Sequence, residues 1–223
     1  QIGSVLEALY STPAGKNTIV IVLADHGDGM GSHRMVTKQV SFYEEMTNVP
    51  FIIAGPGIHP RQKPVEDLLT QPTIDLLPTL CELAGIPVPS SKPGISLAPF
   101  LKGEKQKRQH PYAASEWHSE YEVTVSPGRM IRSPRYKYTH YLEGNGEELY
   151  DMLKDKGERR NLAHDPKYSK ILAEHRALLD DYIRRTQDDY RSLKVEADKR
   201  WRSHAPGYPN HEGPCARDII NRK

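Results

Sequence analysis

Two patterns of apolar residues alternate along the first 105 residues of the chain. Residues 2–11 and 73–84 carry apolar side chains at helical spacing. The runs 18–25 and 49–54 are instead continuously apolar and rich in β-branched residues, which is typical of strands buried on both faces of a parallel sheet. Helices that alternate with such strands predict an α/β domain with a mainly parallel central sheet over residues 1–105.

The pattern changes after residue 105. Short segments rich in aromatic and β-branched residues predict a small antiparallel sheet, with strands at 111–118, 120–125, 128–133 and 136–142. A polar stretch with helical spacing predicts a long helix over residues 167–200 that covers this sheet. We therefore expect a subdomain at residues 106–200 and an extended surface tail at residues 201–223, where proline and glycine recur.

Composition narrows the possible classes of function. Charged residues make up 27% and hydrophobic residues 37% of the 223-residue chain, which is typical of a folded, polar domain. A formal net charge of +2 gives no reason to expect a nucleic acid partner. No apolar run reaches the roughly 18 residues of a membrane-spanning helix. Two cysteines, Cys81 and Cys215, are too few for a disulfide framework or a zinc signature.

Candidate chemistry follows the first apolar run. Asp25 and His26 come directly after it, at the carboxyl end of the predicted strand, where open α/β sheets bind ligands. Asp25 offers oxygen atoms to a divalent cation, and His26 offers a nitrogen. The glycines of the following loop let the backbone approach an anion closely, and Lys38 returns a positive charge. On these residues alone, a turn or a helix cap explains an Asp-His-Gly sequence equally well.

A longer stretch around these residues is similar to a known family. The run ADHGDGMGSHRMVTKQVSFYEEMTNVPFIIAGPG, residues 24–57, resembles the second signature region of the sulfatases, within the alkaline phosphatase superfamily. Three further segments resemble sulfatase motifs in the same order: TIDLLPTLCELAGIPVP, PGISLAPFLKG and EELYDMLKDKGERRNLAHDP. The resemblance extends over about residues 1–185, and several ordered motifs are far more specific than one. It implies part of a sulfatase-like α/β sandwich, followed by a small antiparallel sheet under a long helix.

The resemblance also implies roles for individual residues. Asp25 matches a calcium ligand, and His26 matches the adjacent ligand position, which alternatively touches the sulfate or the nucleophile. Calcium prefers oxygen ligands, so a histidine leaves the identity of the divalent metal open, with Ca²⁺ the first expectation. Lys38 matches a residue that contacts the sulfate and stabilises charge in the transition state.

Other residues are candidates for contact with the substrate. His33 matches a family histidine close to the substrate, with a packing role as the alternative. Arg34 is a candidate for a carboxylate or a second sulfate. Trp117 and His118 suit a sugar ring by stacking and hydrogen bonding, and an ordinary sheet surface is the alternative. Weaker candidates of the same kind are Arg132, Arg135 and His140. The aromatic and basic content of the small sheet, which includes Tyr136 and Tyr138, fits a sulfated carbohydrate better than a lipid.

The nucleophile of the family is not found in this sequence. Sulfatases convert a cysteine or serine within Cys/Ser-x-Pro-x-Arg to formylglycine, and neither Cys81 nor Cys215 lies in that motif. The sequence also begins within a helical pattern, at residues 1–12, that we interpret as the end of a longer helix. We therefore expect formylglycine on an N-terminal half that is the partner of this chain, and we expect the chain alone to be inactive.

The expected activity of the intact protein is that of a sulfuric ester hydrolase that removes sulfate from a glycosaminoglycan-like carbohydrate. Two alternatives stay open. A phosphonate monoester hydrolase or phosphodiesterase of the same superfamily has a similar Asp-His-Gly region, and a catalytically inactive sulfatase-like domain would only bind. Glycan desulfation suits a periplasmic, secreted or lysosomal protein.

Overall fold

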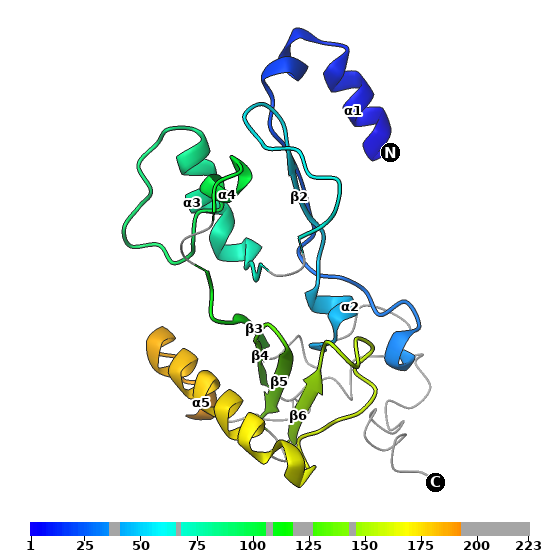
Figure 1. The fold of residues 1–223 in the computed structure, drawn as a ribbon, viewed down its shortest axis with the longest axis vertical. Coiled ribbons are helices and arrows are strands. Elements are labelled where there is room, and N and C mark those ends of the chain that lie inside the picture. The colour runs from blue at the N-terminus through cyan, green and yellow to red at the C-terminus, as the bar shows by residue number, and fades with distance from the viewer. Residues whose placement is uncertain (36–40, 66–67, 106–108, 118–126, 143–145, 193–223) are drawn as a thin grey trace, which may run out of the picture.

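The computed structural model describes residues 1–35, 41–65, 68–105, 109–117, 127–142 and 146–192. An α/β part and a small sheet follow each other along the chain, as Figure 1 shows. The α/β part contains α1 (Ile2–Tyr10), β1 (Val20–Leu23), α2 (Glu44–Thr47), β2 (Phe51–Ala54), α3 (Pro72–Leu83) and α4 (Ala98–Leu101). Within the described ranges, no helix has the length and apolar character needed to cross a membrane.

The two strands of the α/β part pair with each other in antiparallel fashion. The register runs from Val20 opposite Ala54 to Leu23 opposite Phe51. The sequence predicted a mainly parallel central sheet, and this pair of strands is antiparallel. The connection between the strands turns back beyond the end of β1, because Gly27 donates a backbone hydrogen bond to the Met46 carbonyl at 2.9 Å. The strands are half-buried or exposed along their length, so in the described residues they lack the neighbours that a central strand has.

Helix α3 is held by a buried carboxylate in its first turn. Asp75 is fully buried and accepts hydrogen bonds from the backbone N–H groups of Gln71 and Ile95, at 2.7 and 2.8 Å. His110 Nε2 lies 2.8 Å from the same carboxylate. The helix ends before Gly85, whose φ of +70° is the left-handed conformation that glycine favours after a helix. Asp75 thus joins α3, the connector that follows it and the segment that leads into the small sheet.

The small sheet has four antiparallel strands in chain order. They are β3 (Ala113–Trp117), β4 (Gly128–Arg132), β5 (Tyr136–Tyr141) and β6 (Gly146–Asp151). Three of them confirm the predicted strands, and β6 was not predicted. The strand expected at 120–125 and the tail at 201–223 lie outside the described residues.

One face of the sheet is covered by α5 (Ser169–Thr186), as predicted. Leu172 and Leu179 of this helix pack on Ile131, Tyr138 and Leu149 in the main core. The helix is shorter than the predicted span of 167–200, because the chain turns at residue 187 in a left-handed conformation. Beyond the turn, side chains bind the sheet, and this contact outweighs the helical pattern of the sequence. They include Asp188, which pairs with buried Arg129 at 2.6 Å.

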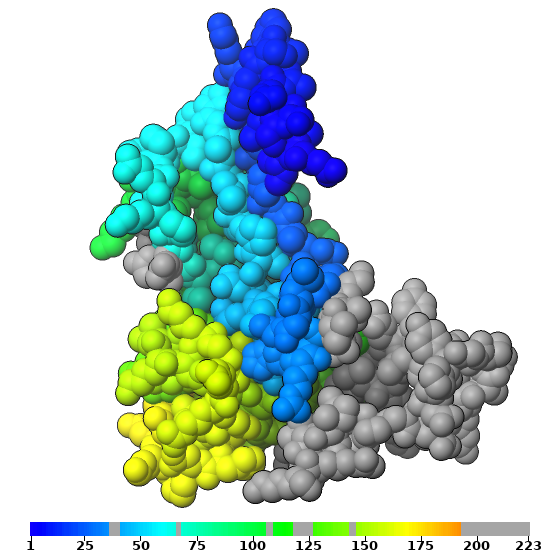
Figure 2. All heavy atoms as spheres, turned by 90° about the vertical axis from the view of Figure 1, so that its right-hand side faces the viewer, coloured from blue at the N-terminus to red at the C-terminus, as the bar shows by residue number. Residues whose placement is uncertain are grey.

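The other face of the sheet rests on the α/β part. Residues in this face alternate in register with those under α5, and they include Gly128, Lys137, Tyr141 and Tyr150. A Cβ on Gly128 would lie 2.6 Å from the Phe42 ring, so the sheet approaches the segment before α2 closely. The space-filling view shows the region around α2 directly against the small sheet (Figure 2). This face therefore places the small sheet next to the loop that carries the candidate chemistry.

Candidate functional site

Asp25 and His26 lie at the end of β1 with accessible side chains. The Asp25 carboxylate is 87% exposed, and its Oδ1 accepts the backbone N–H of His26 at 2.9 Å. His26 Nδ1 lies 2.8 Å from the Gly27 carbonyl oxygen. A carbonyl can only accept, so we infer that Nδ1 carries a proton and that Nε2 is the ring nitrogen that faces Asp25. That nitrogen lies 3.5 Å from Asp25 Oδ2.

This pair fits a divalent cation. A bare ring nitrogen and a carboxylate oxygen repel each other unless a proton or a cation lies between them, and both are common metal ligands. A hydrogen bond from the second ring nitrogen to a carbonyl is the usual support for a metal-binding histidine. In the part of the chain that the structure describes, no three His, Cys, Asp or Glu residues gather closely enough to hold a metal. Asp25 and His26 thus provide two ligands at most.

The loop after His26 is packed so closely that it requires glycine. A Cβ on Gly27 would lie 1.7 Å from the Glu45 carbonyl oxygen, and one on Gly29 would lie 2.4 Å from the Met35 side chain. The backbone hydrogen bond from Gly27 to Met46 fixes the start of the loop on α2. Glycine therefore allows the chain to place Asp25 and His26 directly beside this helix.

Backbone strain is concentrated in the second half of the same loop. Met30, His33 and Arg34 have φ values of +44°, +49° and +62°. The left-handed conformation costs a residue with a Cβ about 1–2 kcal/mol. Such strain persists where surrounding contacts impose it, and it is often found at functional sites.

His33 is held by two neighbours. Its ring lies flat on the ring of Tyr43, with a centroid distance of 3.6 Å and an interplanar angle of 2°. Its Nε2 is 3.9 Å from the Glu45 carboxylate. The pKa of Glu45 is lowered, because a hydrogen bond from Ser32 and the nearby charges outweigh the opposing effect of burial. Glu45 therefore stays negative beside the imidazole. Arg34, next in sequence, is exposed.

The other predicted site residues are only partly described. Lys38 and His118 lie outside the described residues, so their positions stay predictions. Trp117 ends β3 opposite Gly128, which is the residue that approaches Phe42. The indole Nε1 of Trp117 is buried without a hydrogen-bond partner among the described residues. Trp117 thus lies at the end of the sheet nearest the candidate loop, and its ring is half-buried.

Several aromatic and basic residues of the small sheet lie on the face that α5 covers. Tyr138 is buried in the core, Tyr136 packs edge-on against His175 of α5, and His140 Nδ1 lies 2.5 Å from the Tyr190 hydroxyl. The strand register turns these three side chains away from the candidate loop, and a sugar contact by His140 stays a prediction. Arg132 lies on the opposite face, 3.8 Å from Glu44.

A buried ionic cluster, which the sequence pattern did not predict, surrounds Lys137. The Lys137 side chain is 1% exposed, and its ammonium lies 2.7 Å from Glu44 Oε1 and 2.9 Å from Glu158 Oε1. It also donates to the Phe42 carbonyl at 2.8 Å. The available signal was a lysine between Tyr136 and Tyr138 of a predicted strand, although its partners are distant in sequence.

A carboxylate next to this cluster is strongly perturbed. Burial, and then the negative charge of Glu158, raise the pKa of Glu148 to about 7. Burial also raises the pKa of Glu158, although Lys137 opposes this effect. The face of the sheet nearest the candidate loop therefore contains two carboxyl groups that resist ionisation.

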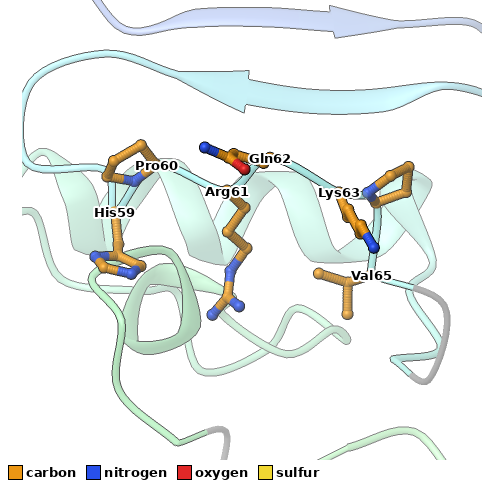
Figure 3. Close-up of a pocket in the computed structure, with 7 residues that line it drawn as sticks. His59, Pro60, Arg61, Gln62, Lys63 and Val65 are labelled. Carbon is orange, nitrogen blue, oxygen red and sulfur yellow. The ribbon is translucent and has the colours of Figure 1, made fainter.

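A separate cavity of about 590 Å³ lies after β2. Its lining includes His59, Arg61 and Lys63, and Figure 3 shows these side chains along one segment. The Arg61 guanidinium lies 4.4 Å from the centre of the Phe100 ring. The lining contains none of the predicted site residues, so this cavity is distinct from the loop after β1.

Comparison with known proteins places these features in a family. The model of the family described as "N-sulphoglucosamine sulphohydrolase, C-terminal" matches residues 31–185. The chain therefore belongs to this family of sulfatase C-terminal regions, and the resemblance read from the sequence is confirmed.

Individual relatives agree with this assignment. The chain is 76% identical over 223 residues to a Δ4,5-hexuronate-2-O-sulfatase of Bacteroides thetaiotaomicron, covering 100% of the chain and 46% of that protein. A solved structure of a 2-O GAG sulfatase is 77% identical with a TM-score of 0.87, covering 98% of this chain and 47% of the other. A phosphonate monoester hydrolase from Silicibacter pomeroyi is 28% identical with a TM-score of 0.72, covering 86% and 40%. The chain thus spans less than half the length of these relatives.

Proposed function

We propose that the protein containing this chain is a sulfuric ester hydrolase that removes sulfate from a glycosaminoglycan-like carbohydrate. The observation that carries the proposal is the 76% identity to a hexuronate 2-O-sulfatase along the entire chain. The name of that relative makes a 2-O-sulfated unsaturated hexuronate our first candidate substrate. Asp25 and His26 support the proposal, because they present a carboxylate oxygen and a ring nitrogen at the strand end where the resemblance implies metal ligands.

Each residue has a role in this proposal. Asp25 and His26 would hold a divalent metal, first of all Ca²⁺, which when bound supplies positive charge to the sulfate oxygens. Lys38 would place a further positive charge on the sulfate. His33, fixed between Tyr43 and Glu45, would contact the sugar or the leaving oxygen. Arg34 and Trp117 would bind more distant parts of the substrate, and the nucleophile would be a formylglycine outside this chain.

Hydrolysis by the complete protein tests the proposal. We expect release of sulfate from a 2-O-sulfated unsaturated uronic acid disaccharide, with calcium present in the purified protein. A second candidate function, phosphonate monoester hydrolysis, is favoured by the likeness to the Silicibacter enzyme. Faster turnover of an aryl phosphonate monoester than of every sulfated disaccharide would favour this alternative. A protein without bound metal and without turnover of either ester would instead be a binding domain.

The role of Lys38 is tested by its replacement. Lys38→Ala in the complete protein should lower kcat roughly 100-fold or more, because a preorganised cation that faces developing charge is a large catalytic effect. Lys16→Ala, at a position in the turn before β1, is the matched control. Turnover within about twofold of the unmodified protein would remove Lys38 from the site.

A further inference from the structure

We propose that Tyr43 is a positioning residue that orients the His33 imidazole, and that Lys137 of the small sheet holds Tyr43 in place. The inference rests on the proposed function, because it concerns a residue that we assign to substrate contact. The contacts of Tyr43 and Lys137 connect the strained loop, α2 and the small sheet.

The first step is the contact between the two rings. His33 has a φ of +49°, a conformation that its own backbone does not favour. Tyr43 covers one face of the imidazole at 3.6 Å with the rings parallel within 2°, and Glu45 lies 3.9 Å from Nε2. The flat contact defines the plane of the imidazole, and Glu45 defines its rotation within that plane. Together they restrict the ring to one orientation.

The second step is the anchoring of Tyr43 itself. The residue before it is held through its carbonyl by the Lys137 ammonium, at 2.8 Å. The residue after it, Glu44, is bound twice: its side chain pairs with Lys137 at 2.7 Å, and its backbone N–H donates to Glu158 at 2.7 Å. The backbone is thus fixed on both sides of Tyr43 by groups that belong to the small sheet and the turn after it.

Lys137 places a charged group in a fully buried position. An ammonium that is 1% exposed loses nearly all its hydration, and ion pairs often do no more than offset that loss. An apolar side chain would fill the same space without this cost. It would not bind both a carbonyl 95 positions away in the sequence and two carboxylates 93 and 21 positions away. The geometry that Lys137 imposes on residues 42–44 therefore explains the cluster better than its contribution to stability does.

The test is a double-mutant cycle in the complete protein. Tyr43→Leu removes the flat ring, and Tyr43→Phe retains it. Tyr112→Leu, the same change at a tyrosine that is more deeply buried beneath α5, controls for general loss of packing. The measurements are kcat and KM on a 2-O-sulfated unsaturated disaccharide, and the melting temperature of each variant.

We expect Tyr43→Leu to lower kcat/KM about 10- to 100-fold, as small misplacements of a catalytic group do, and Tyr43→Phe to stay within about threefold. Tyr112→Leu should lower the melting temperature with little change in kcat/KM. In a His33→Ala background, Tyr43→Leu should lower kcat/KM by less than about threefold, because the residue that Tyr43 positions is already absent. Additive losses, or a His33→Ala variant with normal turnover, would overturn the proposal.

Lys137→Met combined with Glu158→Gln tests the second part, because it removes the ammonium without leaving a buried charge on Glu158. We expect this double variant to lose as much kcat/KM as Tyr43→Leu does. Combined with Tyr43→Leu, it should lower kcat/KM little further. Normal turnover would show that Lys137 is not needed to hold Tyr43 in place.

A measurement without substrate separates this proposal from the proposed function. The nuclear Overhauser contacts between the His33 ring and the Glu45 side chain, which lies 3.9 Å from Nε2, should be lost in Tyr43→Leu and retained in Tyr43→Phe and Tyr112→Leu. If the unmodified protein releases no sulfate from any ester, the proposed function fails, and these contacts still test the positioning. Contacts that are identical in Tyr43→Leu and the unmodified protein would refute it.

Discussion

Glu148 should make the stability of the protein depend on pH between about 5 and 7. Its side chain lies on the face of the small sheet that packs against the segment before α2. Burial raises its pKa most, the charge of Glu158 raises it further, and Lys137 and a hydrogen bond with Tyr141 lower it, with a result of about 7. The groups that interact with it also include two further tyrosines, Tyr43 and Tyr150.

The sign follows from the direction of the shift. The pKa of Glu148 in the folded protein lies above the ordinary value of 4.5, so the folded state retains a proton that the unfolded state releases. The contribution to stability is complete below pH 4.5, and it is lost as the pH rises to about 7. Since one pKa unit corresponds to about 1.4 kcal/mol, the loss amounts to about 3 kcal/mol at most.

Glu148→Gln should abolish this part of the pH dependence, because an amide resembles the protonated carboxyl and does not ionise. The measurement is urea-induced unfolding of the complete protein at pH 5 and pH 8, with the difference between variant and unmodified protein compared at each pH. We expect the variant to be relatively more stable at pH 8 by roughly 1–3 kcal/mol.

The next residue in the strand provides the control. Glu147 lies on the opposite face and pairs with Arg176, and this hydrogen bond lowers its pKa. Its contribution is present at neutral pH and is lost as the pH falls, so Glu147→Gln should alter stability in the opposite sense. If Glu148→Gln has the same pH profile as the unmodified protein, the argument from burial at this position is refuted.

Three further changes test the site and its support. Gly27→Ala should lower turnover by at least about tenfold, because its Cβ would lie 1.7 Å from the Glu45 carbonyl oxygen. The control is Gly3→Ala, whose Cβ meets no atom within 4 Å. Normal turnover of Gly27→Ala would show that the position of the loop is unimportant for activity. Asp75→Ala should lower the free energy of unfolding by about 3 kcal/mol, because it leaves two buried N–H groups without an acceptor; an unchanged urea midpoint would contradict this. Asp25→Asn should reduce the calcium content of the purified protein, measured by elemental analysis, and full occupancy would exclude Asp25 as a ligand.

Local contacts made part of the site predictable. Asp25, His26 and Gly27 are consecutive, and their hydrogen bonds and ion pair are made within that tripeptide, so their arrangement depends on local contacts. The same holds for α3, where helical spacing and a glycine after the last turn are both local signals. The four ordered motifs identified the sulfatase family because each motif is a short, continuous segment.

Other elements depended on residues far apart in the chain. Strand β6 was missed because both of its faces are covered, so Glu147 and Glu148 do not follow the alternation of a half-exposed strand. Helix α5 ends early because Asp188 reaches Arg129 on the sheet, 59 residues earlier. Neither the burial of both faces of β6 nor the pairing of Asp188 with Arg129 can be predicted from the local sequence pattern.

The sequence by itself determined the family of this chain and the candidate residues of the loop after β1, and the tertiary structure decided how that loop is held. The loop after β1 was recognisable from its residue types, but its strained backbone is supported by Tyr43, and Tyr43 is supported by Lys137 from another part of the chain. The antiparallel pairing of β1 and β2 was also a tertiary outcome. Hydrophobic spacing records which side of an element is buried, whereas the partner across an interface depends on how the whole chain closes on itself.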